Sequence, residues 1–219
     1  MTQLLTIFDR LLAQYGQRHW WPGETPFEVC VGAILTQNTN WGNVERAIAN
    51  LKEAGRLSPP GIAQLPPDEL AALIRPAGYF NVKAGRLQAF VAFILQAADG
   101  DLDRLFLRNW PALRDMLLAV RGIGPETADS ILLYAGNQPS FVVDAYTRRI
   151  FNRLGLVDET IAYEPLRAFF MGHLPADAQL YNEYHALLVE HGKQACRTRP
   201  RCTGCCLATL CPTGHAAGI

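Results

Sequence analysis

The stretch that decides the fold, Leu117–Ala135, reads LLAVRGIGPETADSILLYA. Apolar residues recur every three or four positions on both sides of Gly122-Ile123-Gly124-Pro125, which predicts two helices joined by a tight turn. The first helix is expected to end at Gly122, and the second to begin at Glu126 or just before it. Two glycines around one apolar residue let the backbone turn without a Cβ clash, and their N–H groups can bind an anion such as phosphate. Gripping phosphates holds DNA without reading its sequence. An ordinary pair of helices can contain Gly-x-Gly, so the prediction depends on the whole pattern.

The rest of the chain also predicts helices, and alternating strand patterns are nearly absent. Pro59-Pro60, Pro66-Pro67 and Pro76-Ala77-Gly78 mark breaks between them. We find no repeat of fixed period, which argues against a solenoid. The fold class is therefore predicted to be all-α. The expected helices lie near residues 2–15, 26–37, 41–54, 67–75, 81–98, 109–119, 126–135, 145–154, 163–171 and 178–192.

Composition indicates an ordered protein, because 49% of the 219 residues are hydrophobic and 18% are charged. No apolar run approaches the roughly 18–20 residues that cross a bilayer, and residues 1–15 lack the charged start of a signal peptide. We therefore expect a cytoplasmic protein with no membrane partner. The net charge is zero, whereas DNA-binding proteins are usually basic, so phosphate binding would depend on local patches. Two basic clusters are present: the first is Arg148, Arg149 and Arg153, and the second is Lys193, Arg197, Arg199 and Arg201. Solvated surface charge is the alternative for the first cluster.

Five of the six cysteines lie after residue 195. Four of them have the spacing C-x5-C-x2-C-x5-C, namely Cys196, Cys202, Cys205 and Cys211. Four thiolates in one short loop can hold a [4Fe–4S] cluster, and a four-cysteine zinc site is the alternative. Disulfides are disfavoured in a chain without an export signal, and so dense a group is unusual for free buried thiols. Cys206 could replace Cys205, but the two intervals favour Cys205. We expect the metal centre to fix the loop and present its arginines to phosphates.

Asp144 follows the apolar run Phe141–Val143 and precedes an amphipathic helix. A carboxylate at that position is most simply an N-cap, which accepts hydrogen bonds from the first helical turn. The glycine turn upstream offers another interpretation, because it would hold a DNA backbone near this carboxylate. Asp144 is therefore the candidate catalytic residue, with the N-cap role as the alternative.

The hairpin, the Val142-Val143-Asp144 segment and the C-terminal cysteines together resemble the endonuclease III-like superfamily of helix-hairpin-helix DNA glycosylases, over nearly the whole chain. Leu35–Thr39 (LTQNT) resembles that family's helix beside the flipped nucleotide. Gly78–Ala84 (GYFNVKA) resembles its intercalating loop, and His191–Lys193 (HGK) the run into its cluster.

This resemblance implies a six-helix domain over residues 25–138 and a second helical domain over residues 1–24 and 139–219 that carries the [4Fe–4S] loop. It also implies a monomer, associated with the bacterial nucleoid, that binds duplex DNA with a damaged base flipped out. Tyr79 would then wedge into the gap left by that base, although it could equally be core. The candidate DNA-binding residues are Gly122, Ile123, Gly124, Tyr79, Arg148, Lys193 and Arg199.

Two features depart from endonuclease III. The first cysteine interval has five residues where endonuclease III has six. In addition, bifunctional members place at the position of Glu126 a lysine whose amine attacks the sugar C1′ and leads to strand cleavage. A carboxylate cannot form that imine. We therefore predict a monofunctional glycosylase, in which Asp144 stabilises an oxocarbenium-like sugar and assists a water nucleophile.

A narrower resemblance, to the 3-methyladenine glycosylases of the endonuclease III branch, points to the substrate. It is based on His19–Pro22 (HWWP), LTQNT, RPAGYFNVKA and GIGPETAD. It implies that Trp20 and Trp41 sandwich a flipped purine, with Trp21 in the same pocket; Gln37 and Glu126 complete the predicted base pocket. Alkylation at nitrogen makes a purine cationic, so stacking it on indole would gain about 2 kcal/mol of cation–π attraction when desolvated. A hydrophobic clamp is the alternative for Trp20 and Trp21.

The predicted function is thus excision of alkylated purines, 3-methyladenine and 7-methylguanine, from duplex DNA. Uracil, mismatched thymine or an oxidised pyrimidine are alternative substrates for the same pocket. A non-catalytic module that recognises damaged DNA is an alternative of another class. A redox protein is disfavoured, because it would have no use for the hairpin. His185 and His191 lie on an amphipathic helix and are predicted to be structural.

Overall fold

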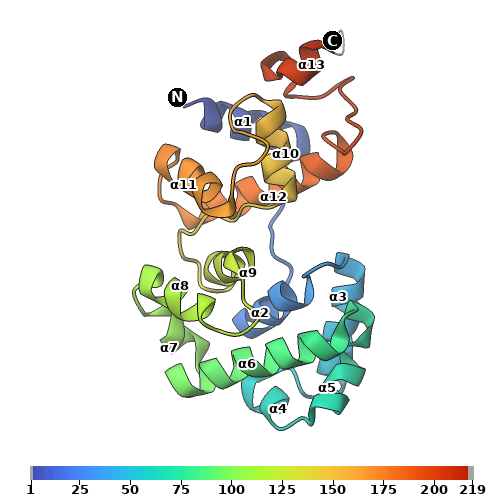
Figure 1. Cartoon of the computed structure of the whole chain (residues 1–219), viewed down its shortest axis with the longest axis vertical. Helices are drawn as coiled ribbons and strands as arrows, with labels where there is room; N and C mark the ends of the chain where they lie inside the picture. Colours follow the sequence, from blue (N-terminus) through green and yellow to red (C-terminus); the bar gives the residue numbers. More distant parts are fainter. Residues whose placement is uncertain (1, 217–219) are drawn as a thin grey trace. The chain divides into compact units, whose positions relative to one another are not determined.

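The structure, a computed structural model, describes residues 2–216 and is helical throughout that range (Figure 1). No strand occurs among these residues, so the all-α prediction is confirmed. None of the helices described there has the length and hydropathy that crossing a membrane requires. The chain divides into two compact units. The terminal unit contains the chain up to Trp20 and from Pro139 onward, and the middle unit is Trp21–Gln138.

The middle unit is built around one long helix, α6 (Phe80–Ala98), which packs against α2, α4, α5 and α7. Leu87, Phe90 and Ile94 on α6 are fully buried. Helix α2 is buried along residues 27–35, as its nearly continuous apolar sequence requires. The other elements are α2 (Pro26–Leu35), α3 (Trp41–Glu53), α4 (Pro59–Ala63), α5 (Pro67–Leu73), η1 (Arg75–Ala77), α7 (Leu102–Phe106), α8 (Trp110–Leu118), α9 (Pro125–Ser130) and the π-helical turn η2 (Ile131–Ala135).

The terminal unit brings the two ends of the chain together. Its helix α12 packs against both α1 and α10. The Phe141 and Phe170 rings stack with centroids 4.2 Å apart, and the buried Tyr184 hydroxyl donates a hydrogen bond to the Leu4 carbonyl at 2.8 Å. The hydrogen bond fixes the N-terminal helix to the C-terminal half, and the stacked rings pack within that half. The elements are α1 (Gln3–Tyr15), α10 (Ala145–Arg153), α11 (Tyr163–His173), α12 (Ala178–Gln194), η3 (Ala208–Leu210) and α13 (Pro212–Ala216).

The structure differs from the sequence predictions in the length of the hairpin loop and in two short helices, α4 and α7, that were not predicted. Helix α8 ends at Leu118, four residues before Gly122, so the loop of the hairpin is longer than predicted. Pro59-Pro60 begins a helix, α4, where we predicted only a break. Proline is tolerated in a first helical turn, and the Ser58 hydroxyl caps this one by accepting from the Gly61 N–H at 3.1 Å.

Candidate active site

The loop between α8 and α9 is built on one glycine, not two. Gly122 has φ +87°, in the left-handed region that favours glycine, and a Cβ there would lie 2.3 Å from Cγ of Arg86. Gly124 has φ −91° in extended backbone, and a Cβ on it would meet nothing within 4 Å. The prediction that both glycines are needed for the turn is therefore wrong for Gly124. Ile123 between them is buried and anchors the loop in the core.

Gln37, predicted to line the base pocket, contacts this loop. Its amide nitrogen donates to the Gly122 carbonyl at 3.2 Å and to Thr127 Oγ1 at 2.8 Å. Its amide oxygen accepts a hydrogen bond from Arg86, which also packs on Gly122. Gln37 thus ties the end of α2 to the hairpin and holds the loop in place. Its role in base recognition stays a prediction.

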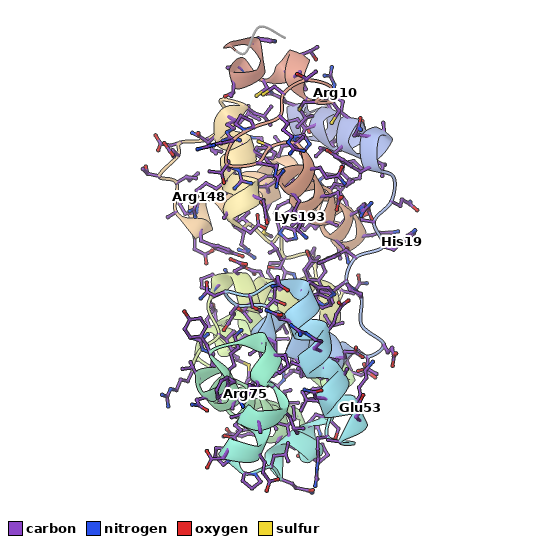
Figure 2. All side chains as sticks on the ribbon, turned by 90° about the vertical axis from the view of Figure 1, so that its right-hand side faces the viewer. Arg10, His19, Glu53, Arg75, Arg148 and Lys193 are labelled. Carbon is purple, nitrogen blue, oxygen red and sulfur yellow. The ribbon has the colours of Figure 1, made fainter. Side chains whose placement is uncertain are left out.

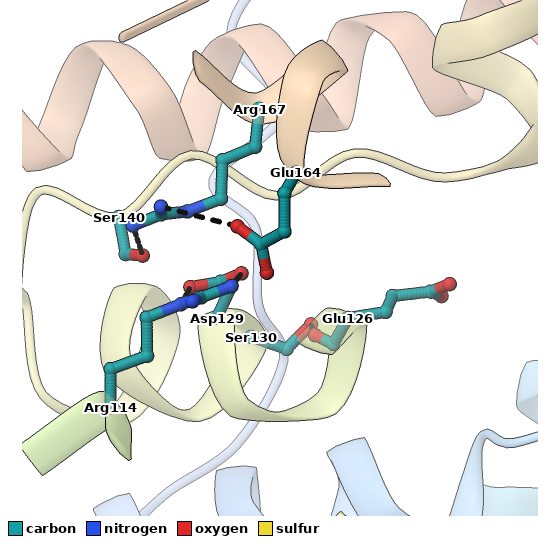
Figure 3. A network of polar contacts seen from close by, with 7 residues as sticks. All are labelled: Arg114, Glu126, Asp129, Ser130, Ser140, Glu164 and Arg167. Atoms are coloured by element: carbon teal, nitrogen blue, oxygen red, sulfur yellow. Dashed lines mark hydrogen bonds and ion pairs between the residues drawn. The ribbon is translucent and has the colours of Figure 1, made fainter. Parts of the chain in front are cut away.

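An ion pair joins the two helices of the hairpin (Figure 3). Arg114 on α8 donates from Nε and Nη2 to the two carboxylate oxygens of Asp129 on α9, at 2.7 and 2.9 Å. The Asp129 side chain is fully buried, and that of Arg114 is 11% exposed. Glu126 lies in the first turn of α9, and its side chain is exposed while its carbonyl accepts from Ser130 Oγ at 2.7 Å. No amine occupies the position where bifunctional relatives are expected to have one.

Three aromatic rings gather at one side of α2. Trp21 contacts Trp41 edge to face at 5.2 Å, and Tyr134 at 5.1 Å with a tilt of 42°. Gly32 gives them room, because a Cβ there would lie 3.2 Å from Nε1 of Trp21 and 3.5 Å from Trp41. Trp20 belongs to the terminal unit, so its predicted pairing with Trp41 across a base stays a prediction. Tyr134 was missed, because nothing in its local sequence separates it from a core aromatic.

Tyr79 is the exposed aromatic of the predicted intercalating loop. Its side chain is 72% exposed, which excludes the alternative that it is core. Its backbone is left-handed, with φ 46°, directly after Gly78 with φ 69°. A tyrosine in this conformation is unusual and costs of order 1–3 kcal/mol. The loop therefore holds an aromatic ring in solvent at an energetic cost, which is typical of a contact surface.

Asp144 is the N-cap of α10, as the alternative interpretation allowed, but only one of its oxygens is used for that purpose. Oδ1 accepts from the N–H of Thr147 at 2.7 Å and from its hydroxyl at 2.9 Å. Oδ2 lies 3.6 Å from Nε2 of His185 on α12, and the Asp144 side chain is 13% exposed. The capping bonds fix the carboxylate and direct its second oxygen toward His185.

His185 is a functional candidate that sequence reasoning took for a structural residue. Its side chain is 8% exposed and lies against Asp144. Burial raises the pKa of Asp144, but His185 and the two bonds from Thr147 lower it by more, so this pKa lies below its usual value. Asp144 is therefore a carboxylate at neutral pH. No sequence spacing links the two residues, because their helices are brought together only by tertiary packing.

The predicted phosphate-binding side chains of the terminal unit differ in exposure. Arg148 on α10 is half-buried, whereas Lys193 near the end of α12 is exposed, as is Arg199 in the loop after it. Figure 2 labels Arg148 and Lys193. Arg149 and Arg153, from the same basic cluster as Arg148, instead bind the backbone of the cysteine loop, which we define as residues 196–211. That cluster is therefore mainly structural, with Arg148 left as its candidate for DNA contact.

The four predicted thiol ligands line one cavity in the terminal unit. Cys196, Cys202, Cys205 and Cys211 all border it, together with Ile150, Leu154 and Leu207. Cys206 lies outside this lining, and its carbonyl accepts from Arg10 at 3.4 Å. Within residues 2–216, no three cysteine, histidine or carboxylate side chains converge closely enough to hold a single metal ion. The thiols therefore surround a space and do not meet at one point.

Two contacts hold the thiols from outside the loop. Nε2 of the buried His191 lies 3.8 Å from Cys205 Sγ, while its Nδ1 lies 3.0 Å from the Tyr15 hydroxyl. Burial lowers the pKa of His191 to about 4, so the ring is neutral, which is compatible with an Nε2–H facing the thiol. Arg153 Nη1 lies 3.3 Å from Cys196 Sγ. Donors of this kind orient metal-binding thiolates.

Comparison with known proteins gives consistent results. A family model for the HhH-GPD superfamily of base excision DNA repair proteins matches residues 31–176. A Methanocaldococcus jannaschii protein provisionally named a DNA repair glycosylase is 48% identical over 212 residues, which cover 94% of this chain and 94% of that protein.

Two solved structures are also similar. The first is the 3-methyladenine DNA glycosylase of H. pylori bound to 1,N6-ethenoadenine, which is 30% identical with a TM-score of 0.76, over 88% of this chain and 98% of that one. The second is endonuclease III in a non-covalent complex with DNA, with a TM-score of 0.84 over 100% of this chain and 99% of that one. At 23% identity, the second likeness concerns the fold alone.

Proposed function

Because the chain belongs to the HhH-GPD superfamily of base excision DNA repair proteins, we propose that this DNA repair glycosylase hydrolyses the N-glycosidic bond of alkylated purines in duplex DNA and leaves the strand intact. The observation that best supports this proposal is the carboxylate of Asp144. It is ionised, fixed by Thr147 and adjacent to His185. The carboxylate would stabilise positive charge on the sugar as the base departs and accept a proton from the attacking water.

The proposal of hydrolysis without strand cleavage depends on Glu126. Its exposed side chain stands in the first turn of α9, where a lysine would supply the nucleophilic amine of a lyase. A carboxylate has no nitrogen with which to form an imine. Water is therefore the proposed nucleophile, and an abasic site in an uncut strand is the proposed product.

An alkylated purine is the proposed substrate because of its charge. The indoles of Trp21 and Trp41 are partly exposed, and aromatic faces attract a cationic ring. A cationic base is also a good leaving group, so the site needs no strong general acid. The similarity to a 3-methyladenine glycosylase favours the same assignment. Flipping the damaged base costs a few kcal/mol, and Tyr79 is the proposed wedge that fills the space it leaves.

We also propose that the cysteine loop holds a [4Fe–4S] cluster through Cys196, Cys202, Cys205 and Cys211. The four thiols border one cavity, and a four-cysteine zinc site, with each sulfur about 2.3 Å from the metal, is the alternative occupant. Four thiolates around such a space suit a cluster with several irons. When bound, the cluster would fix the loop, and the hydrolysis itself would use only the residues described above.

Excision assays test this function. Duplexes that contain 3-methyladenine, 7-methylguanine, uracil, a G·T mismatch or an oxidised pyrimidine should be incubated with the purified enzyme, and released bases measured. We expect release of the two alkylated purines, with no direct nick and no complex trapped by borohydride. Preferred release of another base would overturn the substrate assignment, and a nick or trapped complex would overturn the proposed hydrolysis.

A further inference from the structure

Helix α10 joins the cysteine loop to Asp144. Asp144 caps the first turn of this helix through the N–H of Thr147. At the other end, Arg153 Nη1 donates to the Arg197 carbonyl at 2.6 Å, and its Nη2 donates to the Thr198 carbonyl at 2.9 Å. One helix of nine residues thus contacts the loop at its C-terminal end and carries Asp144 at its N-terminal end.

Helix α12 makes a second connection between the same two places. His185 lies 3.6 Å from Asp144, and His191, further along the same helix, lies 3.8 Å from Cys205 Sγ. Both histidines are buried, and Tyr15 contacts His191 from α1. The cysteine loop and the Asp144 carboxylate therefore both contact the same two helices, α10 and α12, through four separate contacts.

The two helices are also locked to each other. A Cβ on Gly192 of α12 would lie 2.3 Å from the Tyr146 ring of α10, so the helices approach closely only because glycine stands there. Arg149 of α10 adds a bond to the Gly192 carbonyl at 3.3 Å and one to the Cys196 carbonyl at 2.9 Å. Close contact of this kind lets a displacement of one helix be transmitted to the other, because densely packed interiors have low compressibility.

We propose that the cysteine loop positions Asp144 for catalysis, acting through α10 and α12, in addition to any phosphate contact that its arginines make. An N-cap residue moves with its helix, and a shift of the loop at residues 196–198 would displace α10 along with it. The inference rests on the proposed catalytic role of Asp144. It assigns Arg153, His185 and His191 as positioning residues.

Single-turnover kinetics separate this role from simple DNA binding. The Arg153→Met variant, in a preparation with a full complement of iron, should excise base at saturating DNA tenfold to a hundredfold more slowly, because a 1 Å misplacement can cost about a hundredfold in rate. Its Kd for DNA should stay within about twofold. Arg153→Lys, which keeps a donor, should recover part of the rate. Thr203→Ala, an exposed position in the same loop, is the matched control and should change neither quantity.

The opposite result would show that the loop only binds DNA: a weaker Kd for Arg153→Met with an unchanged saturated rate overturns the inference. The Asp144→Asn variant distinguishes a failure of the proposed function from a failure of the positioning role. If that variant remains active, the proposed function fails. If it is inactive while Arg153→Met retains the full rate, only the positioning role fails.

A reverse measurement does not use enzyme activity. Coupling between two sites is reciprocal, so a change at the carboxylate end must also alter the loop. We expect His185→Leu to release iron to a chelator several-fold faster than the wild type, followed by the loss of visible absorbance. The control is Leu166→Ala, a buried truncation on α11 outside the two helices. Equal rates for wild type and His185→Leu, or equal acceleration in the control, would overturn the inference.

Discussion

Arg114→Met should destabilise the protein by about 3–5 kcal/mol, the usual cost of removing one partner from a buried ion pair. The guanidinium makes two bonds of 2.7 and 2.9 Å to a carboxylate whose side chain is fully buried. The variant would remove that guanidinium while the Asp129 carboxyl group stays fully buried. At roughly 2–4 °C per kcal/mol for a chain of this size, the expected fall in Tm is about 6–20 °C.

Urea unfolding followed by circular dichroism measures this loss, and a second variant tests its cause. The double variant Arg114→Met with Asp129→Asn lacks both charged members of this pair, so it should recover part of the stability lost by the single variant. A loss below about 1 kcal/mol in Arg114→Met would refute the reasoning, since that is the value of an exposed pair. A double variant no more stable than the single one would show that the penalty is not the buried charge.

Three further predictions concern function. His185→Leu removes a contribution that lowers the pKa of Asp144, while burial still raises it. The pKa of Asp144 should therefore rise, and the acid limb of the pH–rate profile should move toward neutral pH. An unmoved limb would argue against the pairing of Asp144 with His185. Glu126→Lys should give a complex that borohydride traps on DNA, because a lysine amine at this position would attack the sugar. The absence of a trapped product would show that the position does not reach the sugar. Tyr79→Asn should weaken binding to a damaged duplex. The free energy of unfolding should change by no more than about 1 kcal/mol, because Asn tolerates the left-handed backbone. Equal affinity of the variant and the wild type for the duplex would exclude Tyr79 from the DNA-binding surface.

The longer helices could be predicted from sequence because their apolar periodicity extends over several turns. Helix α6 begins within one residue of its predicted start, and α12 extends two residues beyond its predicted end. Helices α4 and α7 were missed because five residues contain little more than one turn, which gives too few apolar repeats to detect. Such short helices are stabilised by their packing on α6, which sequence periodicity does not show.

The candidate site could be predicted only where its residues are close in sequence. The hairpin, Asp144 and the four cysteines each belong to a local motif. By contrast, the partners of His185 and Tyr134 come from segments far away in the chain, and neither residue has a spacing that reveals this. Gln37 was assigned to the base pocket by resemblance, whereas its bonds in the structure hold the hairpin loop.

The most direct test of the central claim is the amount of free 7-methylguanine released from a duplex in one turnover by the wild type and by Asp144→Asn. Asn preserves the N-cap and removes the charge, so the comparison isolates the ionised carboxylate. We expect the wild type to release the base and the rate of release to fall at least about a hundredfold in the variant. That fall corresponds to a loss on the order of 2.7 kcal/mol of transition-state stabilisation. Neither reaction should cut the strand. Equal release by both proteins would contradict the account.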